Sequence, residues 1–209
     1  MKDYIIIMAD IVDSRKANQK QLMSSFKKVI DEVNIDEKDL LLSPLTITLG
    51  DEFQGIANNV GSAVKLLFTL QEKIIKNKTR FSLRYVILEG RIDTPINHEI
   101  AHGMLGEGLT SAREILETNK NNSDNYYFNL KNKEQTEALL SALLIYQSIV
   151  EGWNLSRDEE LIIEFLELDD YKKVAEKLGK TRSQIWKRRK SLQIEEYLSV
   201  KKVINYIAK

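Results

Sequence analysis

Three acidic residues hold the positions of this chain best suited to chemistry. Residues 49–55 read Leu-Gly-Asp-Glu-Phe-Gln-Gly, which places Asp51 and Glu52 at a glycine-flanked turn between two runs with the composition of strands. Asp10 ends a continuous apolar run at residues 4–10, and the end of a buried strand is where open sheets place functional groups. Asp10 and Asp51 are therefore the candidate pair. The alternative is a strand-end cap and a solvated turn residue.

The elements around these acids predict a sheet covered by helices. Periodicity indicates strands at residues 4–10, 45–48, 53–57, 81–88 and 126–128 and helices at residues 19–33, 60–76 and 109–118. The central hairpin requires an antiparallel pair. The order therefore predicts an α+β fold with a ferredoxin-like or palm-type antiparallel sheet, rather than a doubly wound one.

An uneven charge distribution indicates a second domain. The net charge is zero, yet residues 171–192 contain nine Lys or Arg against one acid, whereas residues 1–155 contain 18 basic and 21 acidic residues. We expect an α/β domain at residues 1–130, a connecting helix within residues 131–152 and a small all-α domain at residues 153–209. A capping box at Ser156 and Glu159 is expected to open the first helix of that all-α domain.

Residues 170–192 predict two short helices separated by a turn at Gly179. Thr181, with Gln184 three residues later, forms a capping box at the start of the second helix. The spacing of Ala175, Gly179 and Ile185 resembles the helix-turn-helix pattern of a small crossing residue, a left-handed turn and a locking apolar residue. The DNA-binding residues expected on the second helix are Arg182, Ser183, Lys187, Arg188 and Lys190.

One position departs from the helix-turn-helix pattern. Arg188 stands where such proteins usually keep an apolar residue, so Trp186 or Leu192 is expected to replace its packing. The alternative to DNA binding is a solvated pair of basic helices that packs on the first domain.

The first domain resembles class III nucleotidyl cyclases and GGDEF proteins. Residues 9–12 (Ala-Asp-Ile-Val) and 49–52 (Leu-Gly-Asp-Glu) match their two metal motifs, and residues 84–90 and 106–113 are similar to later cyclase segments. The resemblance implies that Asp10 and Asp51 bind Mg²⁺ or Mn²⁺, which holds a nucleoside triphosphate, and that the domain forms a homodimer. Further residues for the outer coordination shell or the phosphates are Asp13, Arg15, Glu52 and Arg113.

The residues that complete catalysis in cyclases do not match. Thr110 stands at the position of a cyclase Asn, and Glu114 at the position of a cyclase Arg, with Arg113 one residue early. With its basic C-terminal module and residues 108–114, the chain is identified as a member of the SatD family of bacterial proteins. We expect a DNA-binding regulatory protein with a nucleotide-sensing domain. The alternatives are an active metal-dependent nucleotidyl cyclase or transferase and a metal-free dimeric scaffold.

Residues 98–102 read His-Glu-Ile-Ala-His and fit the H-E-x-x-H zinc motif. Pro95 and Gly103 flank them, which argues against the long helix that this motif needs, so we expect a loop and no zinc. The chain has no cysteine and no apolar run approaching about 18 residues. We therefore expect a soluble cytoplasmic protein without a membrane span.

Overall fold

The computed structural model of the chain describes residues 2–14, 19–120 and 122–209, so Arg15 lies outside the described residues. The chain divides into two compact units, one formed by Met1–Leu140 with Ile207–Lys209 and the other by Ser141–Tyr206. In the described part of the chain, no helix is long and apolar enough to cross a membrane.

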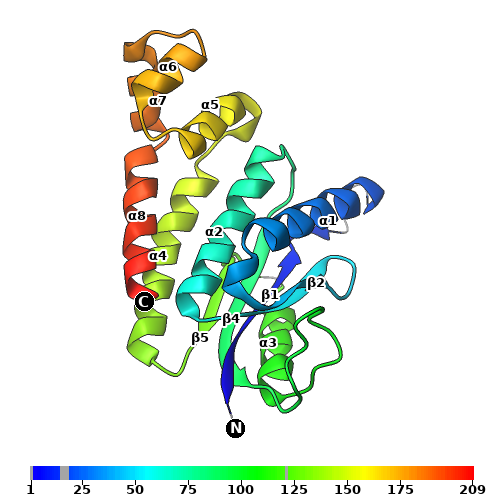
Figure 1. Cartoon of the computed structure of the whole chain (residues 1–209). Coiled ribbons are helices and arrows are strands. Elements are labelled where there is room, and N and C mark those ends of the chain that lie inside the picture. The colour runs from blue at the N-terminus through cyan, green and yellow to red at the C-terminus, as the bar shows by residue number, and fades with distance from the viewer. Residues whose placement is uncertain (1, 15–18, 121) are drawn as a thin grey trace. The chain divides into compact units, whose positions relative to one another are not determined.

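The first unit is built on a sheet in which five described strands follow the order β2-β3-β1-β4-β5 (Figure 1). The strands are β1 (Asp3–Ile11), β2 (Leu41–Ile47), β3 (Glu52–Ala57), β4 (Leu83–Arg91) and β5 (Tyr126–Asn129). Every neighbouring pair is antiparallel except β4 and β5, which run parallel. The predicted antiparallel sheet is therefore wrong for β5. The reason is that a helical crossover after β4 returns the chain in the same direction.

The helices of this unit connect strands that are not neighbours. The helix α1 (Gln19–Asp36), followed by the short η2 (Lys38–Leu40), leads from β1 to β2, and α2 (Val60–Lys76) leads from β3 to β4. Since β3 lies between β1 and β2, and β1 between β3 and β4, these are split βαβ units. The helix α3 (Glu107–Thr118) provides the crossover to β5. The predicted order of strands and helices is confirmed.

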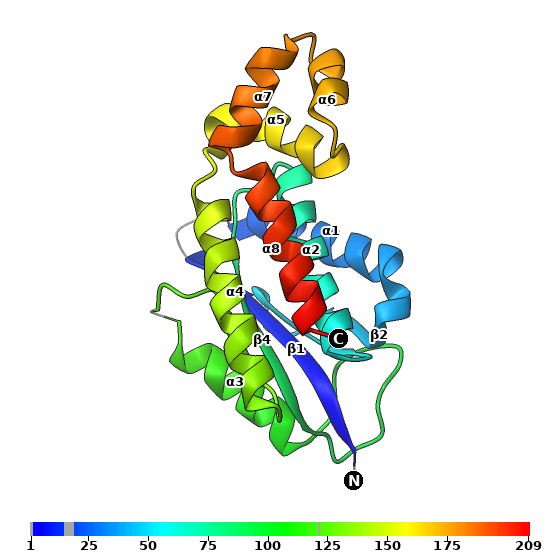
Figure 2. The ribbon, with the colours of Figure 1, turned by 90° about the vertical axis from the view of Figure 1, so that its left-hand side faces the viewer.

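The two faces of the sheet are covered by different helices (Figures 1 and 2). On one face, Phe26 of α1 packs against Phe53 of β3, with ring centroids 6.2 Å apart. On the other, Ile6 and Met8 of β1 share one buried cluster with Leu109 of α3. Side chains alternate along a strand, so Asp10 belongs to the same face of β1 as Ile6 and Met8. The α3 face therefore becomes charged at the end of β1.

α3 approaches β4 closely at Gly90 and Gly108. A Cβ atom at Gly108 would lie 2.8 Å from the carbonyl carbon of Gly90 and 2.8 Å from Cδ1 of Ile6. Distances this short require the backbone of β4 to move. Glycine at position 108 thus sets the distance between the helix and the sheet.

We expect Gly108→Ala to lower the free energy of unfolding by about 1 kcal/mol. Overpacking costs about 1–3 kcal/mol, and the better helix propensity of alanine offsets up to about 1 kcal/mol of that loss. Urea denaturation measures the change. Thr118→Ala, at an exposed position of the same helix, is the matched control and should not destabilise the protein. Stability at or above wild type for Gly108→Ala would contradict the packing argument.

The second unit contains α5 (Leu155–Glu167), α6 (Tyr171–Lys177) and α7 (Arg182–Ser191), with parts of α4 (Lys133–Glu151) and α8 (Ile194–Ile207). Tyr197 lies at its centre, with its ring centroid 4.9 Å from that of Trp153 and 5.5 Å from that of Tyr146. These aromatic side chains are buried and join the C-terminal end of α4 to the start of α8 and to the segment that precedes α5.

The helix starts of this unit test the predicted caps. Gly179 has the predicted left-handed backbone, with a φ of +61°, and Thr181 and Gln184 form the predicted capping box. The capping box predicted at Ser156 is wrong. Asn154 caps α5 instead, because its side chain accepts a hydrogen bond from the backbone N–H of Arg157, and Ser156 lies within the first turn.

Candidate functional site

A row of charged side chains crosses three neighbouring strands at the end of β1. Asp10 pairs in register with Glu52 of β3 and with Arg84 of β4, and directly opposed residues present their side chains on the same face. All three residues are buried, with exposed fractions of 6% for Asp10, 4% for Glu52 and 3% for Arg84. Charges at this depth need partners inside the protein.

Arg84 compensates the charge of Asp10. Its Nη1 donates to both carboxylate oxygens of Asp10 at 3.1 Å, and its Nη2 donates to the backbone carbonyl of Lys120 at 2.8 Å. Burial raises the pKa of Asp10 to about 6, against the opposing charges of Arg84 and Lys120 and with the support of the nearby Asp51 and Glu52 charges. The Asp10 carboxyl therefore titrates near neutral pH beside a fixed guanidinium.

Glu52 connects the row to α3. Its Oε1 accepts a hydrogen bond from Nη2 of Arg113 at 2.9 Å and one from Oγ1 of Thr48 at 3.2 Å. Arg113 is more exposed than Glu52, so this pair reaches from the buried row to the surface. Sequence reasoning ranked Glu52 below Asp51, yet Glu52 is the more deeply buried carboxylate.

Asp51 lies at the hairpin tip, just after Gly50, which has a φ of +80°. Its Oδ2 accepts from Oγ of Ser14 at 2.5 Å, and its carbonyl accepts from the backbone N–H of Ile11 at 2.9 Å. These two bonds join the hairpin to the last residue of β1 and to the segment that follows it. The structure therefore brings Asp10 and Asp51 to the same end of the sheet, where β1 finishes. Asp13, exposed and with a φ of +56°, lies in this segment as well.

This arrangement does not fit a divalent cation held between Asp10 and Asp51. Mg²⁺ needs several oxygen ligands in near-octahedral geometry. Both oxygens of Asp10 face Arg84, and Asp51 accepts from Ser14. Among the described residues, no group of three acidic, histidine or cysteine side chains is placed to hold a metal. The predicted ligands lie at the same end of the sheet without forming a metal site.

A cleft of about 440 Å³ opens where Arg113 reaches the surface. Its walls come from the hairpin at Thr48 and Leu49, from residues 102–106 and from α3 at Leu109, Thr110 and Arg113. The cleft therefore combines an apolar wall with a polar part in which Arg113 lies beside Glu114 and Glu117. It meets the charged row through the Arg113–Glu52 pair.

The H-E-x-x-H segment is a loop, as expected from its flanking residues. Nδ1 of His98 lies 2.7 Å from the carbonyl oxygen of Leu42, whereas His102 lines the cleft. Zinc proteases of this motif need both histidines on one face of a helix, and residues 98–102 do not form one.

The cations of α7 fall into two groups. Three of them pair with carboxylates of the same unit, namely Arg188 with Asp158 at 2.5 Å, Arg189 with Asp169 at 3.1 Å, and Lys190 with Glu195. Arg182, Ser183 and Lys187 are exposed, and within the described residues no carboxylate pairs with Arg182 or Lys187. The predicted DNA-binding set therefore divides into Arg182, Ser183 and Lys187, which are exposed, and Arg188 and Lys190, which pair with carboxylates.

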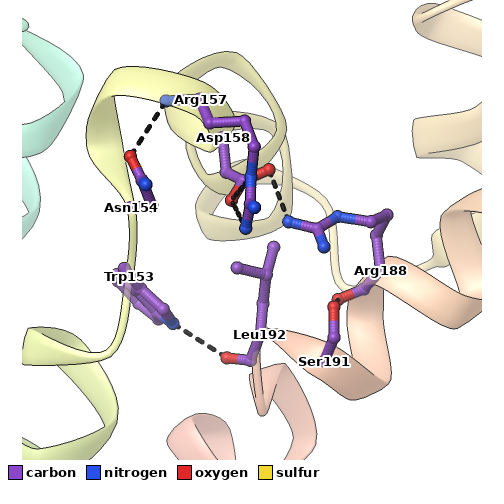
Figure 3. A network of polar contacts seen from close by, with 7 residues as sticks. All are labelled: Trp153, Asn154, Arg157, Asp158, Arg188, Ser191 and Leu192. Atoms are coloured by element: carbon purple, nitrogen blue, oxygen red, sulfur yellow. Dashed lines mark hydrogen bonds and ion pairs between the residues drawn. The ribbon is translucent and has the colours of Figure 1, made fainter.

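Asp158 joins α5 to α7 (Figure 3). It is buried, accepts from Nε and Nη2 of Arg157 at 3.0 and 2.9 Å, and faces Arg188. Burial raises the pKa of Asp158, but hydrogen bonds and charges from the two arginines outweigh it and hold the pKa below its usual value. Nearby, Nε1 of Trp153 donates to the carbonyl of Leu192 at 2.8 Å (Figure 3).

The packing expected in place of an apolar residue at position 188 comes from Leu192. Leu192 is 4% exposed, whereas Trp186 is 46% exposed. Trp186 thus does not take the packing role considered for it. The side chain of Arg188 is about one-third exposed and is committed to Asp158 rather than freely presented.

Sequence reasoning missed Arg84, Ser14 and Asp158. The signal for Arg84 was available, since it is the one charged residue in the run of residues 83–88, and a buried charge requires an opposite one. Asp158 gave no comparable signal, because acidic residues near a helix start are ordinary.

These features define a mixed α+β protein with a charged row at one end of its sheet and a basic pair of helices near its C-terminus. The chain belongs to the SatD family, whose family model matches residues 4–207. No curated protein matches the chain.

Among solved structures, the chain is similar to nucleotidyl cyclases. A bacterial light-regulated adenylyl cyclase is 12% identical with a TM-score of 0.46, over 61% of this chain and 75% or 43% of two cyclase chains. The guanylate cyclase domain of RhGC from Catenaria anguillulae is 15% identical with a TM-score of 0.40, over 56% of this chain and 73% of that one. The family assignment rests on the SatD match, and the cyclase resemblance remains a hypothesis based on the motifs.

Proposed function

We propose that the chain is a DNA-binding regulatory protein and that α6 and α7 act as a helix-turn-helix. The start of α7 is the main support. The helix begins at a complete capping box, directly after the left-handed Gly179, and Ala175 and Ile185 are buried. This places a short exposed helix at a fixed angle to its predecessor, as DNA-binding helix pairs require.

The charges of this helix pair favour DNA over simple solvation. Arg182 at the start of α7 and Lys187 in its middle are exposed, and recognition helices contact base edges and phosphates with such residues. Further exposed lysines without a carboxylate partner among the described residues lie on α6 and in the turn, namely Lys172, Lys173 and Lys180. Unpaired cations release counterions when they meet phosphates, which is the main source of affinity for DNA.

We expect the double variant Arg182→Ala with Lys187→Ala to bind DNA more weakly, with an affinity that falls less steeply as the salt concentration rises. Each lost phosphate contact should lower the slope of log affinity against log salt by about 0.9. The measurement is fluorescence anisotropy of a labelled random-sequence duplex over a series of salt concentrations. Lys202→Ala with Lys209→Ala removes the same charge at exposed positions of α8 and the C-terminus, and serves as the control. An unchanged slope in the Arg182 and Lys187 variant would contradict the assignment.

As a second function, we propose that the first unit binds a nucleotide at the cleft beside Arg113. The cleft offers an apolar wall for a base and a guanidinium for a phosphate, next to the motifs that resemble those of cyclases. The metal implied by that resemblance is not part of this proposal, because Asp10 is committed to Arg84.

Thermal unfolding with ATP or GTP tests nucleotide binding, since a ligand that binds only the native state raises the midpoint. We expect a shift in EDTA as well as in Mg²⁺ or Mn²⁺, and its loss in Arg113→Ala relative to that variant without nucleotide. Arg80→Ala, at an exposed position away from the cleft, is the control. A shift that appears only with a divalent cation would restore the metal site, and no shift with any nucleotide would favour the scaffold alternative.

Two further measurements separate the remaining alternatives. Chromatography of the nucleotide after incubation distinguishes a sensor from a cyclase or transferase, because only an enzyme forms a new product. Light scattering of the purified protein tests the homodimer predicted from the cyclase resemblance.

A further inference from the structure

An exposed tryptophan lies among the cations of α7. Trp186 is 46% exposed, whereas the only other tryptophan, Trp153, is 7% exposed and hydrogen-bonded to Leu192. Residues four apart share one side of a helix, so Arg182, Trp186 and Lys190 follow one line along α7. Trp186 thus belongs to the face that the proposed function directs toward DNA.

The fold of the second unit does not explain this side chain. The buried apolar residues of α7 and its C-cap are Ile185 and Leu192. The indole of Trp186 is a large apolar group with one polar edge, and such groups are enriched where proteins meet partners. Trp186 lies between cations, with Lys187 adjacent, so we expect its partner to carry negative charge.

The major groove of DNA satisfies both requirements. Its walls are lined by phosphates, and its floor carries one apolar feature, the 5-methyl group of thymine. A helix inserted with Arg182 and Lys187 near the phosphates would bring a long side chain from its middle turn to the floor. An indole has no acceptor for a base edge, but its ring matches a methyl group.

We propose that Trp186 contacts the 5-methyl group of a thymine in the major groove and thereby contributes sequence preference to α7. This inference rests on the proposed DNA binding by α7. It assigns separate tasks to neighbouring residues, because Arg182 and Lys187 supply charge whereas Trp186 reads a base. The loss of Trp186 should therefore lower affinity without changing the salt dependence.

The test compares duplexes that differ only in the thymine methyl group. Wild-type protein should bind a thymine-containing duplex about four-fold more tightly than the same duplex with deoxyuridine, which is the effect of burying one methyl group. Trp186→Ala should remove this difference and keep the wild-type salt slope. Lys202→Ala, an exposed substitution on α8, should retain the difference.

Tryptophan fluorescence gives a second measurement with an internal control. DNA should quench the emission of Trp153→Phe, in which Trp186 is the only tryptophan, and should leave Trp186→Phe unaffected. DNA binding without quenching, or with equal affinity for thymine and deoxyuridine, would overturn the role of Trp186 and leave the proposed function intact. Absence of DNA binding by wild type would overturn both. A Trp186 emission that shifts with protein concentration alone would assign this face to a second copy of the chain.

Discussion

Arg84→Met is expected to lower the free energy of unfolding by about 3–5 kcal/mol at pH 8, because it leaves a buried carboxylate without its partner. Arg84 donates to both oxygens of Asp10 and also to the carbonyl of Lys120, so the substitution removes three hydrogen bonds. Methionine fills most of the same space, which restricts the loss to charge and hydrogen bonding. Denaturation by urea, followed by circular dichroism, measures it.

The pH dependence of this loss follows from the titration of Asp10. Its pKa is raised from 3.8 to about 6 in the folded protein, so the stability that the protonated carboxyl contributes is complete below pH 3.8 and is lost as the pH rises through 6. Without the Arg84 charge the folded pKa rises further, and the carboxyl accepts a proton at higher pH. The loss should therefore be largest at pH 8 and should shrink as the pH falls through 6 toward 4.

Two controls make the Arg84 experiment specific. Arg182→Met, at an exposed position at the start of α7, should cost less than about 0.5 kcal/mol at either pH. Asp10→Asn combined with Arg84→Met should recover part of the stability, since it removes the uncompensated charge. Equal losses at pH 5 and pH 8 for Arg84→Met would show that packing, and not the ion pair, accounts for the effect.

Local patterns made much of this fold predictable. The apolar stripe and flanking turns at residues 60–76 predicted α2 with the bounds that it has, Val60–Lys76. Thr181, Gln184 and Gly179 act within one helical turn of each other, so their cap and turn could be inferred from spacing alone. The parallel pairing of β5 could not be inferred in this way, because it depends on where the crossover places the strand.

The candidate site shows the same division between local and distant contacts. The sequence pattern predicted Asp10 at the end of a strand and Asp51 at the tip of a hairpin, and the fold brings both to one end of the sheet. The partner of Asp10 lies 74 residues away in β4, and only the strand register reveals that Arg84 opposes it. Motif matching therefore found both carboxylates but not the guanidinium that pairs with Asp10.

Arg188→Met is expected to lower the free energy of unfolding by about 2–3 kcal/mol. This is the usual contribution of a hydrogen bond to a charged group, and the substitution removes the one between Arg188 and Asp158. Arg188 faces the buried Asp158, which would keep only Arg157 as its cation (Figure 3). Trp153 lies beside this network, so its fluorescence during urea denaturation reports the loss. The same substitution should leave the salt slope of DNA binding unchanged, because the guanidinium is committed inside the unit.

The titration of Asp158 gives this prediction a second test. Its pKa is held below 3.8 in the folded protein, so its contribution to stability is complete above pH 3.8 and is lost as the pH falls through the lowered value. Wild type and Arg188→Met should therefore differ at pH 7 and converge under strong acid. In a double-mutant cycle with Asp158→Asn, the two losses should be strongly non-additive. A salt slope lowered by about 0.9 with wild-type stability would instead make Arg188 a phosphate contact, as its position on α7 first indicated.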